Sequence, residues 1–197
     1  MSTNAQADSI YVNEEHLALR DTLDRFLANE VEPHGERWEH AGMVPRDVIR
    51  KLGNLGVLGI TYPTEYGGAG ADAITSLVFA EALSRSTFGG FVATVLVHTD
   101  MASPHLVHGG SAEQKAKYLP RIVRGELVSA IAMTEPDVGS DIAHLKSRAR
   151  RDGDHWVLNG TKTYITNAVE GSCFLVYAKV DGKLTSFVVD RDCKGFS

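Results

Sequence analysis

AIAMTEPDVGSD, residues 130–141, separates a helical first part of the chain from a strand-rich last part. Pro136 fixes one backbone dihedral, and Gly139 permits a left-handed conformation or a close approach. Successive amides around Gly139 and Ser140 can form a concave nest of donors, to which the Ser140 hydroxyl adds another. The residues alone allow two interpretations: an anion site, or a plain turn capped by polar side chains, which is the commoner feature.

The residues before this stretch follow a helical period of apolar side chains. Asn13 is a suitable N-cap for the first helix, and Pro33 ends that helix. Ser111 and Gln114 form the sequence signature of a capping box for the last helix, which Pro120 is expected to end early. Other helices are expected over about 45–52, 72–86 and 88–107.

After about Leu127 the apolar period changes to that of strands. Asp152-Gly153 and Asp181-Gly182 each predict a hairpin, and Asn159-Gly160 predicts a third turn that leads into a strand over 161–166. We therefore expect an α+β protein. An all-α helical bundle over 1–127 is followed by an antiparallel, barrel-like β-domain over 128–197.

Composition excludes several classes of function. The net charge is -5 and no basic run is present, which argues against nucleic acid or an anionic membrane as the partner. The longest apolar stretch, 88–97, is about half of the roughly twenty residues that a membrane span needs. The first ten residues resemble neither a secretory signal nor a transit peptide, so a cytoplasmic location is expected. Cys173 and Cys193 lie far apart and are expected to be reduced thiols.

Two groups of ionisable residues could bind a metal or act as a base. His98, His105 and His108 fall near one face of a helix, as metal ligands can, but no carboxylate or Cys completes the set. Pro104 is expected to interrupt this helix, so we expect packed or hydrogen-bonded histidines and no metal. Glu135 could be taken for a general base, but its place beside Pro136 favours a turn-stabilising hydrogen bond.

The stretch over 133–141 and a second one, Lys162 to Asn167, together resemble the two flavin-contacting segments of the acyl-CoA dehydrogenase family. The resemblance implies that Thr134 contacts the pyrimidine side of FAD. It implies that Ser140 approaches both the FAD pyrophosphate and the bound acyl-CoA. Tyr164 would stack on the isoalloxazine ring, where many relatives have Trp, and Thr166 would reach flavin N5. The full set of FAD contacts implied is Ile131, Met133, Thr134, Gly139, Ser140, Tyr164, Ile165 and Thr166, with no catalytic residue and no metal ligand assigned.

The resemblance also implies a reaction and partners. The reaction is FAD-dependent α,β-dehydrogenation of acyl-CoA thioesters, of the β-oxidation type in fatty acid metabolism, with an electron-transfer flavoprotein as electron acceptor. Full-length relatives are homo-oligomers, in particular tetramers. The regions 98–100 and 130–133 are most similar to the long-chain branch of the family.

One departure from the family is large. The C-terminal helical domain, which supplies the catalytic base, further flavin contacts and the oligomer interface, has no counterpart in these 197 residues. We therefore expect a truncated portion that is inactive alone. Two alternatives stay open: another flavoenzyme on the same scaffold, such as an acyl-CoA oxidase, a nitroalkane oxidase or an acyl-carrier-protein dehydrogenase, or a non-catalytic remnant.

Overall fold

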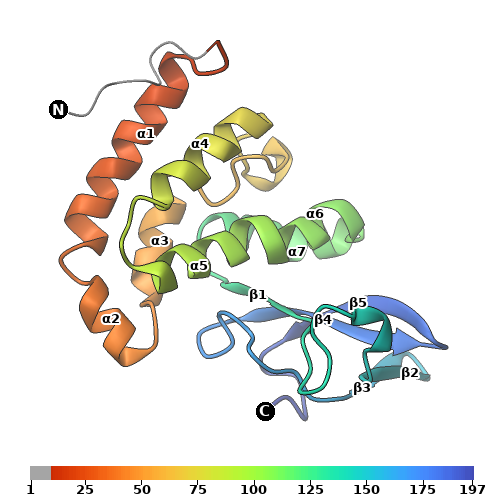
Figure 1. Cartoon of the computed structure of the whole chain (residues 1–197). Coiled ribbons are helices and arrows are strands. Elements are labelled where there is room, and N and C mark those ends of the chain that lie inside the picture. The colour runs from red at the N-terminus through yellow and green to blue at the C-terminus, as the bar shows by residue number, and fades with distance from the viewer. Residues whose placement is uncertain (1–9) are drawn as a thin grey trace.

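The computed structural model describes residues 10–197, in which a helical part is followed by a sheet (Figure 1). The helices lie together, and β1 leads from them into the sheet. The helices are α1 Glu14–Phe26, α2 Gly35–Ala41, α3 Arg46–Asn54, α4 Ala73–Leu83, α5 Gly89–Leu96, α6 Ser103–Gly109 and α7 Ala112–Val123. The strands are β1 Ser129–Ala132, β2 Arg148–Asp152, β3 His155–Asn159, β4 Cys173–Val180 and β5 Lys183–Asp190. The expected order of a helical part and then a sheet is confirmed.

Side-chain caps begin the helices where the sequence predicted them. The Asn13 carboxamide accepts a hydrogen bond from the amide of His16, and the His16 ring accepts one from the amide of Asn13. Ser111 and Gln114 make the same reciprocal pair at α7. Each pair satisfies amides that a helix start leaves without partners.

Two prolines do not interrupt their helices, and both expectations were wrong. Pro120 lies inside α7, which continues for another turn because Ile122 is fully buried there and Gly125, at φ 67°, closes the turn. An added Cβ at Gly125 would lie 2.5 Å from the carbonyl oxygen of Ile49, so this close approach requires glycine. Pro104 falls in the first turn of α6, which follows α5 through a π-helical turn, η3 Val97–Ala102, without a break.

The sheet is mixed and not antiparallel throughout. The chain enters β1 from the helices and returns to β4 in the same direction, so these two strands pair in parallel, with Ser129 opposite Cys173. β4 also meets β2 in parallel at Lys179 and Arg148. The hairpins β2–β3 and β4–β5 are antiparallel, as expected.

Turn chemistry explains the β4–β5 hairpin but not the absence of a turn at Asn159-Gly160. Asp181 and Gly182 have φ values of 49° and 80°, which is the geometry that a tight hairpin turn demands. Asn159-Gly160 does not form the expected turn, because β3 ends at Asn159 and residues 160–166 form no strand. Gly160 instead allows a close approach between two backbone segments. An added Cβ there would lie 2.8 Å from the Cα of Ser147, so the approach requires glycine at this position.

Two apolar clusters stabilise the fold. One lies among α1, α3, α4 and α5, and its fully buried members include Leu23, Leu52 and Leu83. The other joins α6 and α7 to β4, where Leu119 packs with Cys173 and Leu175. Because the second cluster contains both helix and strand residues, the sheet is held against the helices by a shared core. No helix in the described range is long and apolar enough to span a membrane.

Candidate functional site

The two stretches singled out in the sequence lie next to each other. The amide of Thr163 donates a hydrogen bond to the carbonyl oxygen of Thr134 at 3.0 Å. The Lys162 ammonium donates to the carbonyl oxygen of Met133, also at 3.0 Å. Backbone and side-chain hydrogen bonds therefore join the loop after β1 to the segment before β4, as the expected common site requires.

Glu135 fixes the loop after β1. Its buried carboxylate accepts hydrogen bonds from the amides of Lys146 and Ser147, at 2.6 and 2.9 Å, and from the Ser147 hydroxyl. The Lys162 ammonium lies 2.9 Å away. Burial alone would raise the pKa of Glu135, but the bonds from Ser147 and Lys162 and from the two amides lower it to about 2. The predicted turn-stabilising role is confirmed, and a carboxylate held this firmly in its ionised form is a poor base.

A tight turn follows Glu135 and presents the next residues outward. The amide of Glu135 donates to the carbonyl oxygen of Val138 at 2.8 Å, and the reverse bond measures 3.1 Å. Val138 is buried, while Gly139 and Ser140 are exposed. Gly139 does not adopt the left-handed conformation that its sequence allowed, and an added Cβ there would meet no protein atom within 4 Å. No protein neighbour therefore requires a glycine at this position.

Tyr164 has the most unusual backbone of the site. Its φ is 55°, which is uncommon for an aromatic residue, and its side chain is 93% exposed. A strained, exposed aromatic is held in place only because its neighbours over-determine the backbone. Here Thr163 is bonded to Thr134, and Asn167, at φ 68°, is anchored on the other side.

Ile165 and Thr166 line a cavity of about 250 Å³ between the helices and this segment. Thr94 of α5 and Arg46 of α3 form part of its wall. A second cavity of about 1060 Å³ lies along β3, β4 and β5, and Ile165 lines it too. Ile165 thus stands between the two cavities. Ile131 in β1 and the next site residues, Met133 and Thr134, are partly buried where the loop after β1 begins.

Sequence reasoning assigned no role to Asn167, which has one. Its amide group donates hydrogen bonds to the carbonyl oxygens of Thr94 and Ser129, at 3.0 and 3.1 Å. One side chain thereby ties the segment after Thr166 to α5 and to the start of β1. Asn tolerates a left-handed backbone better than most residues, and that preference was the available signal.

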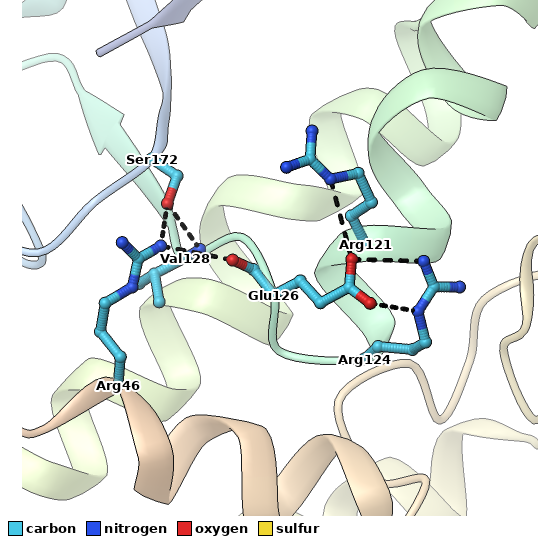
Figure 2. A network of polar contacts seen from close by, with 6 residues as sticks. All are labelled: Arg46, Arg121, Arg124, Glu126, Val128 and Ser172. Carbon is cyan, nitrogen blue, oxygen red and sulfur yellow. Dashed lines mark hydrogen bonds and ion pairs between the residues drawn. The ribbon is translucent and has the colours of Figure 1, made fainter. Parts of the chain in front are cut away.

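Arg46 anchors the connection that leads into β1 (Figure 2). Its guanidinium donates to the carbonyl oxygen of Glu126 at 3.3 Å and to the hydroxyl of Ser172. That hydroxyl also accepts a bond from the amide of Val128 at 3.4 Å. The Glu126 carboxylate pairs in turn with Arg124, at 2.7 Å. α3 therefore holds the residues immediately before β1 in place.

The three histidines of the predicted helix face do not converge. His98 is fully buried and hydrogen-bonded, whereas His105 bonds the carbonyl oxygen of Met101 at 2.8 Å and packs edge-on against Tyr177. Within residues 10–197, no three His, Cys, Asp or Glu side chains are placed to hold a metal ion. Cys173 and Cys193 are both free thiols, and burial raises the pKa of Cys173 to about 12.

The same order, a helical part followed by a mixed sheet, is found in a known family of proteins. Residues 13–126 match the family model described as acyl-CoA dehydrogenase, N-terminal domain, and residues 130–197 match the acyl-CoA dehydrogenase middle domain. The chain belongs to the acyl-CoA dehydrogenase family.

Individual relatives agree with this assignment. The chain is 36% identical to mitochondrial isovaleryl-CoA dehydrogenase of Pongo abelii over 94% of its own length and 46% of the relative's. It is 37% identical to mitochondrial long-chain specific acyl-CoA dehydrogenase of Mus musculus, over 92% and 44%. A solved acyl-CoA dehydrogenase of Bacillus anthracis, complexed with FAD, is 39% identical with a TM-score of 0.87, over 93% and 32%. The chain thus spans less than half the length of each.

Proposed function

We propose that this chain provides the FAD- and acyl-CoA-contacting part of an enzyme that dehydrogenates acyl-CoA thioesters between their α and β carbons. The observation that carries the proposal is the hydrogen-bonded junction of the two segments at Thr134 and Thr163. It places the strained, exposed Tyr164 and the cavity-lining Thr166 beside the loop that carries Ser140. The relative crystallised with FAD supports this choice of cofactor.

The residues present fit a flavin on physical grounds. The Tyr164 ring is an exposed aromatic face. Thr166 borders a cavity, and its hydroxyl can donate a hydrogen bond there. Gly139 leaves open space where a side chain would stand, beside the exposed Ser140. Aromatic surface for a ring system and small polar residues for a phosphate therefore occur on two joined segments.

Each residue has a role in binding or orientation. Thr134 and Thr166 would donate or accept at the polar edge of the ring system, and Tyr164 would stack on it. Ile131, Met133 and Ile165 would supply apolar contact, while Gly139 and Ser140 would meet the pyrophosphate. Ser140 would also meet the acyl-CoA. FAD, when bound, supplies the acceptor for the β-hydride of the substrate.

The proton of the α carbon needs a carboxylate that residues 10–197 do not offer at this site. Glu135 accepts four hydrogen bonds and keeps a pKa near 2, so its affinity for a proton is too low for that task. The base would come from the C-terminal region that longer relatives contain. We propose on the same ground that the isolated chain is inactive as a dehydrogenase.

Several further parts of the proposal follow from family membership. The division into 1–127 and 128–197, a homo-oligomeric assembly and electron transfer to an electron-transfer flavoprotein are proposed in this way. A cytoplasmic location stays a prediction; the two curated relatives named above are mitochondrial. Identity to the isovaleryl-CoA enzyme, 36%, is nearly the same as to the long-chain enzyme, 37%, so we propose acyl-CoA thioesters in general as the substrate class.

Flavin titration tests the central claim. Purified chain is titrated with FAD, alone and together with the separately produced C-terminal half of a relative, and quenching of flavin fluorescence is followed. Ser140→Ala and Thr166→Ala should weaken binding, whereas Thr22→Ala on α1 serves as a matched control that leaves it unchanged. Equal affinities for all variants, or no binding in either arrangement, would overturn the proposal. Fast reoxidation of the reduced flavin by oxygen would favour an oxidase on the same scaffold.

A further inference from the structure

His98 forms the centre of a buried polar network between the helices and β1. Its ring is fully buried in the π-helical turn η3. The Nδ1 atom lies 3.0 Å from the amide nitrogen of Ser129, and Nε2 lies 3.3 Å from the carbonyl oxygen of Ile122. A carbonyl only accepts and an amide only donates, so Nε2 carries the hydrogen and the neutral ring has one fixed tautomer.

Two buried hydroxyls extend this network. The Ser129 hydroxyl lies 2.9 Å from His98 Nδ1 and 2.8 Å from the Ser103 hydroxyl. The Ser103 hydroxyl donates to the carbonyl oxygen of His98 at 2.6 Å. The π-helical turn makes this possible, because it widens the helix and the amide of Ser103 also bonds the His98 carbonyl. All three side chains are fully buried.

Ser129 is held from both sides. His98 accepts from its amide, and Asn167 donates to its carbonyl oxygen at 3.1 Å. Ser129 begins β1, which leads directly into the loop of Thr134, while Asn167 directly follows Thr166. A single chain of hydrogen bonds from His98 therefore reaches the base of both segments of the candidate site.

We propose that His98 is a positioning residue that sets the relative placement of the segments 133–140 and 164–166. This inference rests on the proposed function where it concerns FAD. Apolar side chains could fill the same space without the free-energy cost of desolvating three polar groups. The need to fill this space therefore does not explain why His98, Ser103 and Ser129 stand there. A fully satisfied buried network specifies one arrangement of the elements that it joins. His98 thereby determines the geometry in which a flavin would be held, without touching it.

Hydrogen exchange of the unliganded chain tests the positioning role directly. His98→Phe keeps an aromatic ring but removes both ring hydrogen bonds. We expect amides in 129–134 and 163–168 to exchange about tenfold faster, beyond any change common to the whole chain. His98→Asn keeps an acceptor near the Ser129 amide and should restore part of the protection. The matched control is Leu83→Ala in the other core, which should raise exchange throughout the helical part and spare these segments.

A second variant and a measurement of FAD affinity complete the test. If His98→Phe does not fold, Asn167→Ala removes the second half of the network from a partly exposed position and should loosen the same segments. FAD affinity should fall at least tenfold in His98→Phe and stay unchanged in Leu83→Ala. Uniform changes in exchange, alike in both variants, would overturn the positioning role and leave the proposed function intact. Failure of the wild-type chain to bind FAD would overturn only the proposed function, because the exchange measurement needs no flavin.

Discussion

Lys162 and Glu135 form an ion pair of 2.9 Å in which the side chains are only 12% and 4% exposed. The pKa of Lys162 is lowered, because the effect of burial exceeds the opposite effect of the Glu135 carboxylate. Removal of one partner from such a pair is far more damaging than loss of a surface pair, because the other charge stays buried. This pair joins the loop after β1 to the segment before β4.

Lys162→Met should therefore lower the free energy of unfolding by about 3 kcal/mol, measured by urea denaturation. Lys146→Met is the matched control, because its ion pair with Asp137 is exposed and should contribute less than about 1 kcal/mol. Equal losses in the two variants would contradict the special weight given to the buried pair.

The stability of the chain should fall between pH 6.5 and pH 4 because of His98. Burial lowers the pKa of His98 from 6.5 to about 4, so below pH 6.5 the unfolded chain binds a proton that the folded chain does not. The part of the free energy of unfolding that depends on His98 is fully present above pH 6.5. It is lost progressively down to about pH 4 and amounts to about 3 kcal/mol. Urea denaturation at several pH values measures this slope. His98→Phe should abolish it, and a slope that persists unchanged in that variant would contradict the assignment.

A second acid transition should follow at lower pH. The pKa of Glu135 is about 2 in the folded chain and near 4.5 in the unfolded chain. The contribution of Glu135 to the free energy of unfolding is therefore present above pH 4.5 and is lost towards pH 2. Nuclear magnetic resonance of the Glu135 carboxyl carbon reports this titration directly. A midpoint near 4.5 in the folded chain would show that the bonds from Ser147 and Lys162 do not hold the carboxylate.

Two glycines should respond oppositely to alanine. Gly139→Ala should change the free energy of unfolding by less than about 0.5 kcal/mol, because its Cβ meets no protein atom, yet it should weaken FAD binding. Gly160→Ala should cost about 1 to 3 kcal/mol, because its Cβ would collide with Ser147. Thermal unfolding and flavin titration of both variants make the comparison. A stability loss at Gly139 would mean that the loop itself needs glycine there.

Tyr164→Gly should separate stability from binding. Glycine adopts a φ of 55° without strain, so the variant should be more stable than Tyr164→Ala by about 1 kcal/mol. Both variants should bind FAD more weakly, because both lack the exposed ring. Retained affinity in either one would remove Tyr164 from the proposed contacts.

The chain alone should not dehydrogenate acyl-CoA. Loss of a positioned base slows proton abstraction by about two to four orders of magnitude. Anaerobic bleaching of the flavin by acyl-CoA substrates of several chain lengths, with residues 1–197 supplied with FAD, is the assay. Bleaching at an enzymatic rate would place a base within this chain, and Glu135→Gln would then show whether Glu135 is that base.

What neighbouring residues control could be read from the sequence. The N-cap at Asn13, the capping box at Ser111 and the Asp181-Gly182 turn each depend on residues within a few positions of the backbone that they stabilise. The bonded role of Glu135 was indicated by the adjacent Pro136. The order of a helical part before a sheet followed in the same way, from a change in the apolar period.

What distant segments control was decided by the tertiary structure. Parallel pairing of β1 with β4, the continuation of α7 past Pro120 and the absence of a turn at Asn159-Gly160 all depend on partners far away in the chain. For Gly160 that partner is Ser147, whose approach replaces the expected hairpin. His98 and Asn167 acquire their roles only where η3, β1 and the segment after Thr166 meet. Local propensity is a weak preference that burial of apolar surface and satisfaction of buried polar groups override, and both arise only when the elements pack.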